Sequence, residues 1–341
     1  MDVSTVDVSG SGRSVAFPTF FSKQYEYFHY IDLCEHTKHD VCALKARGVG
    51  FSEIGASLGV RLYTTNSRSH TIYTAYNYDF LSAVLRKCWE QLEFLNAETE
   101  GGLRHLRQRY NSDNHKRASL LNKQREESGF MSEILGIVAD IPRKLRGDRA
   151  DRLFFEEAGS NPVLVKTYMQ SKALVEILGR KFGTRFVWGT GGDSGPALAG
   201  LASMFKDPKG FNILPYKHNY TKTGEYTLTA YFIPAFTFVN IEGIIDNRGV
   251  TNIEKAKAHY LAQRNALMDD PKAYMIECAE FCFTPEDALA LEGDNDFDTI
   301  LLQEQLSAIT LHKMGVPIER GFLEYSFTNG EQSADNIRGF R

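Results

Sequence analysis

The 341-residue sequence carries almost no excess charge and little cysteine. Its 39 basic and 43 acidic residues give a formal charge of −4, which excludes a positive field over the whole surface of the kind that attracts nucleic acid. Any nucleic-acid contact must therefore come from a local surface. The five cysteines are an odd number scattered along the chain, so we expect free thiols in a reducing compartment and no disulfide framework.

Long hydrophobic runs are also missing. The most apolar region, 230–245, contains Pro234, Asn240 and Glu242 and falls short of the roughly 18 uninterrupted apolar residues that a membrane span needs. The first residues, MDVSTVDVSGSGRS, have neither a basic start nor an apolar stretch, so no secretory signal is expected. We therefore expect a soluble protein, and its 43% apolar content predicts a sizeable core.

Helical and strand-like segments alternate in the first third of the chain. Helices are predicted over 24–33, 53–60 and 78–95, and strands over 40–44 and 71–75. Because parallel neighbours need crossover helices, this order predicts an α/β fold with a mainly parallel sheet. Further strands are predicted over 131–141, 152–155 and 184–188 and within 211–239, and two helices over 253–268 and 271–281.

A basic segment interrupts this pattern. Residues 104–125 contain seven basic side chains against a single acid, Asp113, and few strongly apolar positions. We predict an exposed helical hairpin or a mobile insertion at about 100–128. Its cations suit a salt-dependent contact with DNA phosphates that is independent of base sequence, and a solvated helical face is the alternative. The basic side chains are Arg104, Arg107, Arg109, Lys116, Arg117, Lys123 and Arg125.

A glycine-bearing loop lies between the first predicted strand and the helix that follows it. Its sequence over 43–55, ALKARGVGFSEIG, places small residues where backbone N–H groups turn around an anion at a helix N-terminus. The common P-loop pattern, GxxxxGK[ST], is not met, because Phe51 stands in place of lysine, although Ser52 occupies the Mg²⁺-binding hydroxyl position. Lys45 and Arg47 supply positive charge from the head of the loop. An ordinary strand-to-helix turn is the alternative interpretation.

Two adjacent carboxylates follow the apolar strand predicted at 152–155. Glu156 and Glu157 would point in alternate directions if strand geometry persisted. One carboxylate would then bind hydrated Mg²⁺ while the other polarises a water molecule, which is the chemistry of a Walker B site. Two surface glutamates after a core strand are the alternative.

A third polar loop, 186–195 (FVWGTGGDSG), also follows a strand and is alone a weak signal of a phosphate-sensing loop.

Two groups of cysteine and histidine have spacings that could hold zinc, but buried thiols are favoured in both. The pair Cys278 and Cys282 lacks a second pair of ligands. In the other group a cysteine falls within a predicted core strand, which favours packing. That group consists of Cys34, His36, His39 and Cys42.

Taken in order, these segments resemble the large terminase subunit of tailed bacteriophages, the ATPase that packages viral DNA. Gln24 in FFSKQYEYFHYI resembles the family's adenine-binding glutamine, and KARGVGFSE resembles the variant phosphate loop of lambda-like terminases, with its lysine at the head of the loop. KLRGDRADRLFFEEAGS resembles the Walker B segment, and WGTGGD the coupling motif after it. The resemblance spans roughly residues 17–300 and implies a RecA/ASCE-like P-loop fold with a small lid subdomain.

The resemblance implies a role for each matching residue, with ATP and Mg²⁺ as cofactors. Lys45 takes the place of the Walker A lysine, Arg47 stabilises the transferred phosphoryl group, and Glu157 is the catalytic base. Mg²⁺ is bound by Ser52 and Glu156, and Arg146 is expected to act across a subunit interface. The expected nucleotide contacts are Gln24, Lys45, Ala46, Arg47, Gly48, Val49, Gly50, Phe51 and Ser52, and the expected coupling residues are Thr190, Gly191 and Gly192.

The resemblance also predicts the organisation of the chain. We expect a flexible tail over 1–14, the ATPase core over 15–240, a lid-like helical subdomain over 241–290, and over 291–341 a linker toward a nuclease domain that this chain lacks. The only acidic group near that linker precedes a predicted helix, which favours helix capping over metal binding. It consists of Asp294, Asp296 and Asp298.

The implied activity is that of an ATP-hydrolysing motor that translocates double-stranded DNA into a procapsid. The implied partners are double-stranded DNA, a portal protein, a small terminase subunit and further copies of the chain in a ring. The implied location is the host cytoplasm, transiently on the procapsid, without membrane association. Phe51 and the glutamate at position 156, where the family usually has aspartate, leave open a non-hydrolytic scaffold. Another nucleic-acid-dependent ATPase, such as a helicase, is the other alternative.

Overall fold

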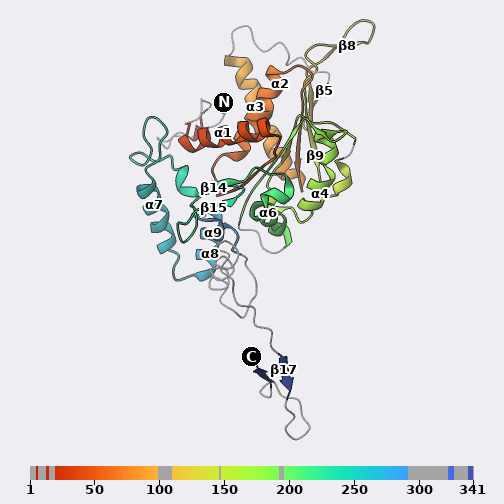
Figure 1. Cartoon of the computed structure of the whole chain (residues 1–341). Coiled ribbons are helices and arrows are strands. Elements are labelled where there is room, and N and C mark those ends of the chain that lie inside the picture. The colour runs from red at the N-terminus through yellow and green to blue at the C-terminus, as the bar shows by residue number, and fades with distance from the viewer. Residues whose placement is uncertain are drawn as a thin grey trace. The chain divides into compact units, whose positions relative to one another are not determined.

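The computed structural model describes residues 5–6, 13–14, 20–98, 110–145, 147–191, 196–290, 322–325 and 337–340. The chain divides into two compact units, Met1–Thr299 and Ile300–Arg341. In the second unit β17 (Phe322–Tyr325) and β18 (Ile337–Phe340) pair antiparallel. The first unit holds the central sheet with its helices (Figure 1) and a short antiparallel pair, β1 (Thr5–Val6) and β2 (Arg13–Ser14).

The central sheet has eight strands in the spatial order β16, β3, β13, β10, β4, β9, β6, β5. The first six of these are parallel, whereas β6 and β5 run antiparallel to their neighbours. The continuously apolar sequences of the central strands suit a sheet that is covered on both faces. The strands are β3 (Val41–Lys45), β4 (His70–Ala75), β5 (Tyr110–Ser112), β6 (His115–Arg117), β9 (Glu133–Val138), β10 (Arg152–Phe155), β13 (Thr184–Thr190) and β16 (Tyr231–Ile233).

Helices cover both faces of this sheet (Figure 1). On β13, Trp188 packs against Phe51 of α2, whereas a Cβ on the next residue, Gly189, would lie 3.0 Å from Leu201 of α6. Since successive strand side chains point to opposite faces, α2 and α6 cover opposite faces. Within the described ranges no helix combines the length and apolarity needed to cross a membrane. The helices are α1 (Ser22–Thr37), α2 (Phe51–Thr65), α3 (Tyr78–Glu98), α4 (Leu164–Gln170), α5 (Lys172–Val175), α6 (Pro196–Lys206), α7 (Ile253–Asn265), α8 (Pro271–Glu280) and α9 (Pro285–Ala288).

The strand order confirms the predicted fold class. β13 lies between β3, which leads into the glycine-bearing loop, and β10, which leads into the two carboxylates. This is the arrangement of a RecA/ASCE-like P-loop fold, with a mainly parallel sheet flanked by helices. Local signals were also confirmed: the backbone N–H groups of Lys272 and Ala273 donate to Asp270, the residue before Pro271 at the start of α8.

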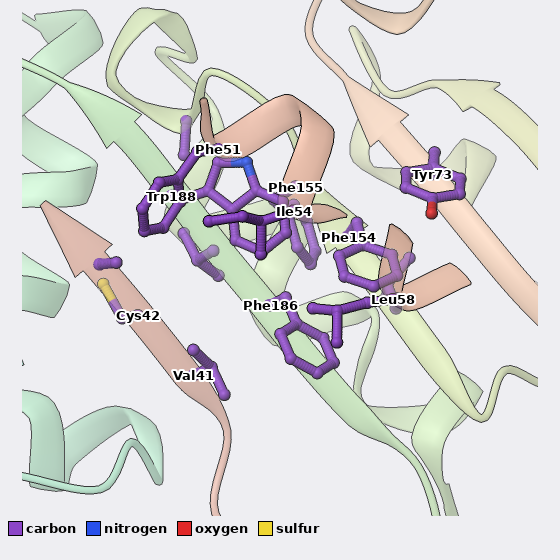
Figure 2. Close-up of a cluster of buried hydrophobic side chains, with 14 of the residues drawn as sticks. Val41, Cys42, Phe51, Ile54, Leu58, Tyr73, Phe154, Phe155, Phe186 and Trp188 are labelled. Carbon is purple, nitrogen blue, oxygen red and sulfur yellow. The ribbon is translucent and has the colours of Figure 1, made fainter. Parts of the chain in front are cut away.

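An aromatic row across the sheet forms the centre of the core under α2. Tyr73, Phe154 and Phe186 lie in register on β4, β10 and β13, with ring centroids 4.7 and 4.6 Å apart. Figure 2 shows Ile54 and Leu58 of α2 facing this row. Each such fully buried side chain contributes about 1.5–3 kcal/mol through removal of apolar surface from water. The row therefore fixes α2, and with it the glycine-bearing loop, on the sheet.

The basic segment is not a helical hairpin, and that prediction was wrong for its described part. β5 and β6 form a β-hairpin that extends the central sheet beside β9. Lys116 lies over the Trp89 ring at 4.7 Å, and Arg117 pairs with Glu127 and Glu133. Backbone pairing with β9 and these internal partners outweigh the low apolar content on which the prediction rested. Outside the described residues lie Arg104, Arg107 and Arg109.

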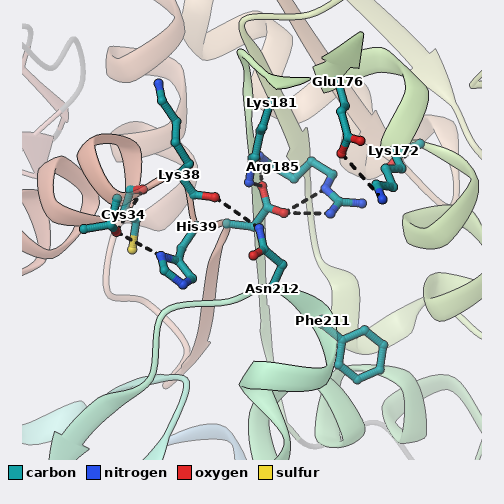
Figure 3. Close-up of polar contacts among 12 residues, drawn as sticks. Cys34, Lys38, His39, Lys172, Glu176, Lys181, Arg185, Phe211 and Asn212 are labelled. Carbon is teal, nitrogen blue, oxygen red and sulfur yellow. Dashed lines mark hydrogen bonds and ion pairs between the residues drawn. The ribbon is translucent and has the colours of Figure 1, made fainter. Parts of the chain in front are cut away.

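A buried ionic cluster holds the amino ends of the strands together. Asp40, immediately before β3, is completely buried, and Lys181 Nζ lies 2.6 Å and Arg185 Nη2 2.7 Å from its carboxylate oxygens (Figure 3). The backbone N–H of Arg185 and the hydroxyl of Tyr168 also donate to this carboxylate. Burial alone would raise the pKa of Asp40, but the two adjacent cations outweigh it and lower that pKa. The cluster thus locks β3 to β13.

Removing the buried carboxylate should destabilise the fold strongly. Asp40→Asn leaves Arg185 and Lys181 buried without a counter-charge, which costs about 3–5 kcal/mol. The control is Lys172→Ala, which breaks an exposed pair with Glu176, also visible in Figure 3, and should cost no more than about 1 kcal/mol. Urea unfolding followed by circular dichroism measures both. Equal losses in the two variants would contradict the assigned importance of the cluster.

Acid should destabilise the protein through a buried histidine. His218 ends β14 (Tyr216–His218), which pairs with β15 (Thr227–Thr229). Burial and then the charge of Lys23 lower the pKa of His218 from its ordinary 6.5 to about 4. The unfolded chain therefore binds more protons between these pH values, and stability falls by up to about 1.4 kcal/mol per pH unit as the pH drops through them.

The His218→Gln variant tests this pH dependence, because glutamine keeps a hydrogen-bonding side chain but does not titrate. The free energy of unfolding measured from pH 7 to 4 should decline less steeply in His218→Gln than in the wild type. Exposed His29 provides the control, and His29→Gln should keep the wild-type slope. A wild-type slope in His218→Gln would show that other groups cause the decline.

Candidate functional site

The loop from β3 to α2 has a backbone that requires glycine at two positions. Gly48 and Gly50 adopt φ values of +77° and +73°, and a Cβ on either would meet nothing within 4 Å. Glycine is thus needed for the left-handed conformation and not for lack of space. Gly50 directly precedes the first residue of α2. Because glycine has no side chain, nothing at this position covers the start of the helix. The loop consequently turns sharply and leaves open space beside it.

The backbone N–H groups of this loop divide into two sets. Those of Ala46 and Arg47 donate to the carbonyls of Ile233 and Glu280, which anchors the start of the loop. Within the described part of the chain no acceptor pairs with the N–H groups of Gly48, Val49 or Gly50. Unpaired backbone donors and the partial positive charge at the start of α2 are the features with which a helix N-terminus binds an anion.

Lys45 lies at the carboxyl end of β3, as the last residue of that strand and the residue directly before the loop. Its side chain is almost fully buried, and Nζ lies 3.3 Å from Glu157 Oε1. In the parallel registers Lys45 is level with Thr190 of β13 and Ile233 of β16. The lysine predicted from its unusual position therefore lies beside the predicted catalytic carboxylate, 112 residues away in the chain.

The side chains of Phe51 and Val49 lie in the core, and the sequence predicted nucleotide contact at both positions. Each is buried, and the Phe51 ring lies 4.7 Å from the Tyr27 ring and 5.7 Å from that of Trp188. Phe51 stands where the common P-loop has lysine. Its side chain belongs to the core, so any contact with a ligand from this position would come from the backbone.

Glu156 is buried at the carboxyl end of β10. Ser52 Oγ lies 3.4 Å from Glu156 Oε2, and Glu156 Oε1 has no hydrogen-bond partner among the described residues. Burial, and then the neighbouring charge of Glu157, raise the pKa of Glu156 to about 7. A hydroxyl and a carboxylate are hard oxygen ligands, which suits a magnesium ion that keeps several waters.

Glu157 does not continue the strand, which corrects the expectation of alternating carboxylates. β10 ends at Phe155, and Glu157 adopts the left-handed region with φ +43°. Such a conformation costs a non-glycine residue of order 1–3 kcal/mol and is typical of functional sites. The sharp turn is what brings the Glu157 carboxylate to Lys45 while the preceding carboxylate stays buried.

The end of β13 is packed against two neighbouring segments with almost no free space. A Cβ on Gly159 would lie 2.2 Å from the Thr190 carbonyl oxygen, and one on Gly191 would lie 1.8 Å from the Ala288 carbonyl oxygen in α9. Thr190 and Gly191 thus lie between the segment after the carboxylates and α9. Gly192, the third predicted coupling residue, and Arg146, the predicted trans-acting arginine, lie outside the described residues.

The two remaining predicted residues are Gln24, in α1, and Arg47, in the loop. Gln24 lies in the first turn of α1, where its Oε1 accepts from the Phe21 backbone N–H at 3.0 Å. It shares a helix face with Tyr27, which contacts the start of α2. Arg47 is exposed, and its Nε lies 3.0 Å from Glu280 Oε2 at the end of α8.

Sequence reasoning missed Glu280 and Trp188. Glu280 contacts the loop through both its carbonyl and its carboxylate, but it stands 233 residues from Arg47 and in no motif. Trp188 was visible in the segment FVWGTGGD, yet nothing in the sequence distinguished it from other core aromatics. Pairing between distant segments is the only signal that could have found either residue.

The alternative zinc sites find no support among the described residues. No group of three or more histidine, cysteine, aspartate or glutamate side chains lies close enough to hold a metal there. All five cysteines are free thiols, and four of them are buried. The acidic group of Asp294, Asp296 and Asp298 lies outside the described residues.

Comparisons with known proteins give structural likenesses only. No family model matches the chain, and no curated protein matches it. Among solved structures, the large terminase ATPase domain of Thermus phage P74-26 is 15% identical, with a TM-score of 0.48 over 72% of this chain and 88% of that one. A point mutant of that domain gives a TM-score of 0.49 at the same identity and coverage. The large terminase of a thermophilic bacteriophage in complex with ADP is 14% identical, with a TM-score of 0.40 over 57% of this chain and 44% of that one.

The close contact at the end of β13 can be tested with two alanine substitutions. Gly191→Ala must displace the α9 backbone and should lower the free energy of unfolding by about 1–3 kcal/mol. Gly48→Ala meets open space, and only its left-handed backbone costs free energy, about 1 kcal/mol. Hydrogen exchange should show lost protection in α9 for Gly191→Ala alone. Full protection of α9 in that variant would contradict the packing described.

Proposed function

We propose that this chain is an ATPase that drives the packaging of double-stranded DNA into a viral procapsid. The observation that carries the proposal is the joining of two polar pairs at one edge of the sheet. Lys45 meets Glu157, and Ser52 meets Glu156, each across more than 100 residues of sequence. Together with a loop whose N–H donors have no acceptor among the described residues, these four side chains are the groups that phosphoryl transfer from a nucleotide requires.

In this proposal the phosphates of ATP lie against the loop between β3 and α2. The N–H groups of Gly48, Val49 and Gly50 would donate to phosphate oxygens, and Lys45 would balance their charge. Arg47 would leave Glu280 to stabilise the charge that develops on the transferred group. Gln24 would contact the adenine, exchanging its present bond to the Phe21 N–H for one to the base.

Ser52 and Glu156 are the residues that would hold Mg²⁺. Their oxygens would supply two hard ligands, and phosphate and water would supply the others. Bound Mg²⁺ would neutralise charge on the phosphate oxygens.

Glu157 would act as the general base, and Lys45 controls its availability. The two side chains are paired at 3.3 Å. A phosphate group at the loop would compete for Lys45 and free the Glu157 carboxylate to orient a water molecule for attack. The pair thereby links nucleotide binding to the formation of an active base.

Movement would pass from the site to the helices over 241–290, which we propose as the lid. Thr190 is level with Lys45, and Gly191 touches α9, so a shift at the phosphate edge reaches these helices directly. Arg146 would act on the site of a neighbouring copy in a ring. The motor would work with double-stranded DNA, a portal protein and a small terminase subunit, in the host cytoplasm and on the procapsid.

Steady-state ATP hydrolysis with and without linear double-stranded DNA tests the proposal. Lys45→Ala and Glu157→Gln should each lower kcat by at least about 100-fold, because each removes a group of the reacting site. Lys172→Ala, an exposed lysine on a different element, should keep the wild-type rate. Glu157→Gln should still bind ATP, since the phosphate loop is intact. Stimulation of the wild type by DNA would favour the motor.

Three results would separate the alternatives. Turnover without DNA stimulation would argue against a DNA motor and for another ATPase. Binding of ATP without turnover by the wild type would point to a missing neighbour in the ring. Failure of the wild type to bind ATP would leave a DNA-binding or capsid-binding scaffold as the better interpretation.

A further inference from the structure

Trp188 is a fully buried aromatic residue, and its indole nitrogen is buried with it. A purely apolar role would not require that nitrogen. Its ring lies between Phe51 of α2, at 5.7 Å, and Phe154 of β10, at 5.3 Å. Figure 2 shows the indole beside Phe51 and Ile54, over the sheet. Phenylalanine would satisfy this packing, and burying an indole N–H without a partner costs about 1–3 kcal/mol.

A carboxylate oxygen beside this indole, Glu156 Oε1, also lacks a hydrogen-bond partner among the described residues. Trp188 Nε1 and Glu156 Oε1 are both buried, and neither makes a hydrogen bond of standard geometry to another described residue. The two side chains approach the same glycine. A Cβ on Gly55 would lie 2.6 Å from Trp188 Cζ2 and 3.1 Å from Glu156 Oε1. A donor and an acceptor without other partners thus lie together in a low-dielectric space.

We propose that Trp188 is a positioning residue for Glu156. Its indole N–H holds Oε1 of the carboxylate, which leaves Oε2 directed at Ser52 and the metal side of the site. Gly55 is part of this arrangement, because any side chain there would separate the two groups. The inference rests on the proposed function for its consequence, Mg²⁺ binding, but the contact itself is independent of that function.

The contact answers a need that the glutamate creates. The side chain of Glu156 has three rotatable bonds and can adopt several rotamers. It keeps one orientation toward a ligand only if contacts at both carboxylate oxygens restrict those rotamers. Ser52 holds one oxygen at 3.4 Å, and Trp188 supplies the contact to the other.

Indole resonances test the contact without any nucleotide. The chain has two tryptophans, so a ¹⁵N-tryptophan-labelled sample shows two indole N–H signals, which Trp89→Phe assigns. In Glu156→Ala the Trp188 signal should move upfield in the proton dimension as its acceptor is lost. Glu156→Gln retains a carbonyl acceptor and should restore much of the wild-type position. The Trp89 indole donates to the Asp113 carbonyl, so its signal should stay unchanged throughout and serves as the internal control.

Mg²⁺ dependence of ADP binding tests the consequence. By calorimetry, Trp188→Phe should weaken Mg²⁺-dependent ADP binding about tenfold, the size expected for one hydrogen bond to a charged group, and leave metal-free ADP binding unchanged. Phe154→Leu is the matched control, because it loosens the same aromatic cluster but removes no donor. It should lower thermal stability and keep the metal dependence.

The outcomes separate the inference from the proposed function. A Trp188 signal that does not move in folded Glu156→Ala overturns the positioning role, whatever the nucleotide data show. Equal metal dependence in Trp188→Phe and the wild type overturns it as well. If the wild type binds no ADP at all, the proposed function fails, and the indole signals alone decide whether Trp188 holds Glu156.

Discussion

The parallel alignment of β3, β13 and β10 is the constraint on which the site depends. Parallel strands place all their carboxyl ends at one edge, and ligands of such sheets bind at that edge. Here the alignment brings Lys45 level with Thr190 and sets Glu156 and Glu157 just beyond the adjoining strand. The buried cluster around Asp40 joins the opposite ends of β3 and β13. A shift of one residue in the register of these two strands would therefore disrupt both the cluster and the site.

Burial makes the charged groups of the site dependent on one another. Lys45 and Glu156 are nearly inaccessible to water, and a buried charge is costly unless it is paired or neutralised. Lys45 pairs with Glu157, and Glu156 stays buried with its pKa raised to about 7. Each of these buried groups therefore depends on a neighbour of opposite charge. The proposed phosphate and divalent cation would be such neighbours for Lys45 and Glu156.

Much of the fold could be predicted, because apolar strands and their intervening helices have strong local signals. The strand predicted at 152–155 coincides with β10, and the capped start of α8 follows from Asp270 and Pro271. The basic segment could not be assigned, since its strands are stabilised by pairing with β9 and by the partners of Arg117. The turn at Glu157 was also missed, because a left-handed glutamate has no signature in sequence.

The sequence by itself determined the parallel α/β architecture and which segments carry glycines, cations and carboxylates at strand ends, because these follow from local propensity and chain order. Only the tertiary structure decided that Lys45 faces Glu157, that Phe51 belongs to the core, and that Glu280 and Trp188 contact the site. Those facts depend on how strands far apart in the chain align. Strand register is set by packing over the whole sheet and cannot be read from any single segment.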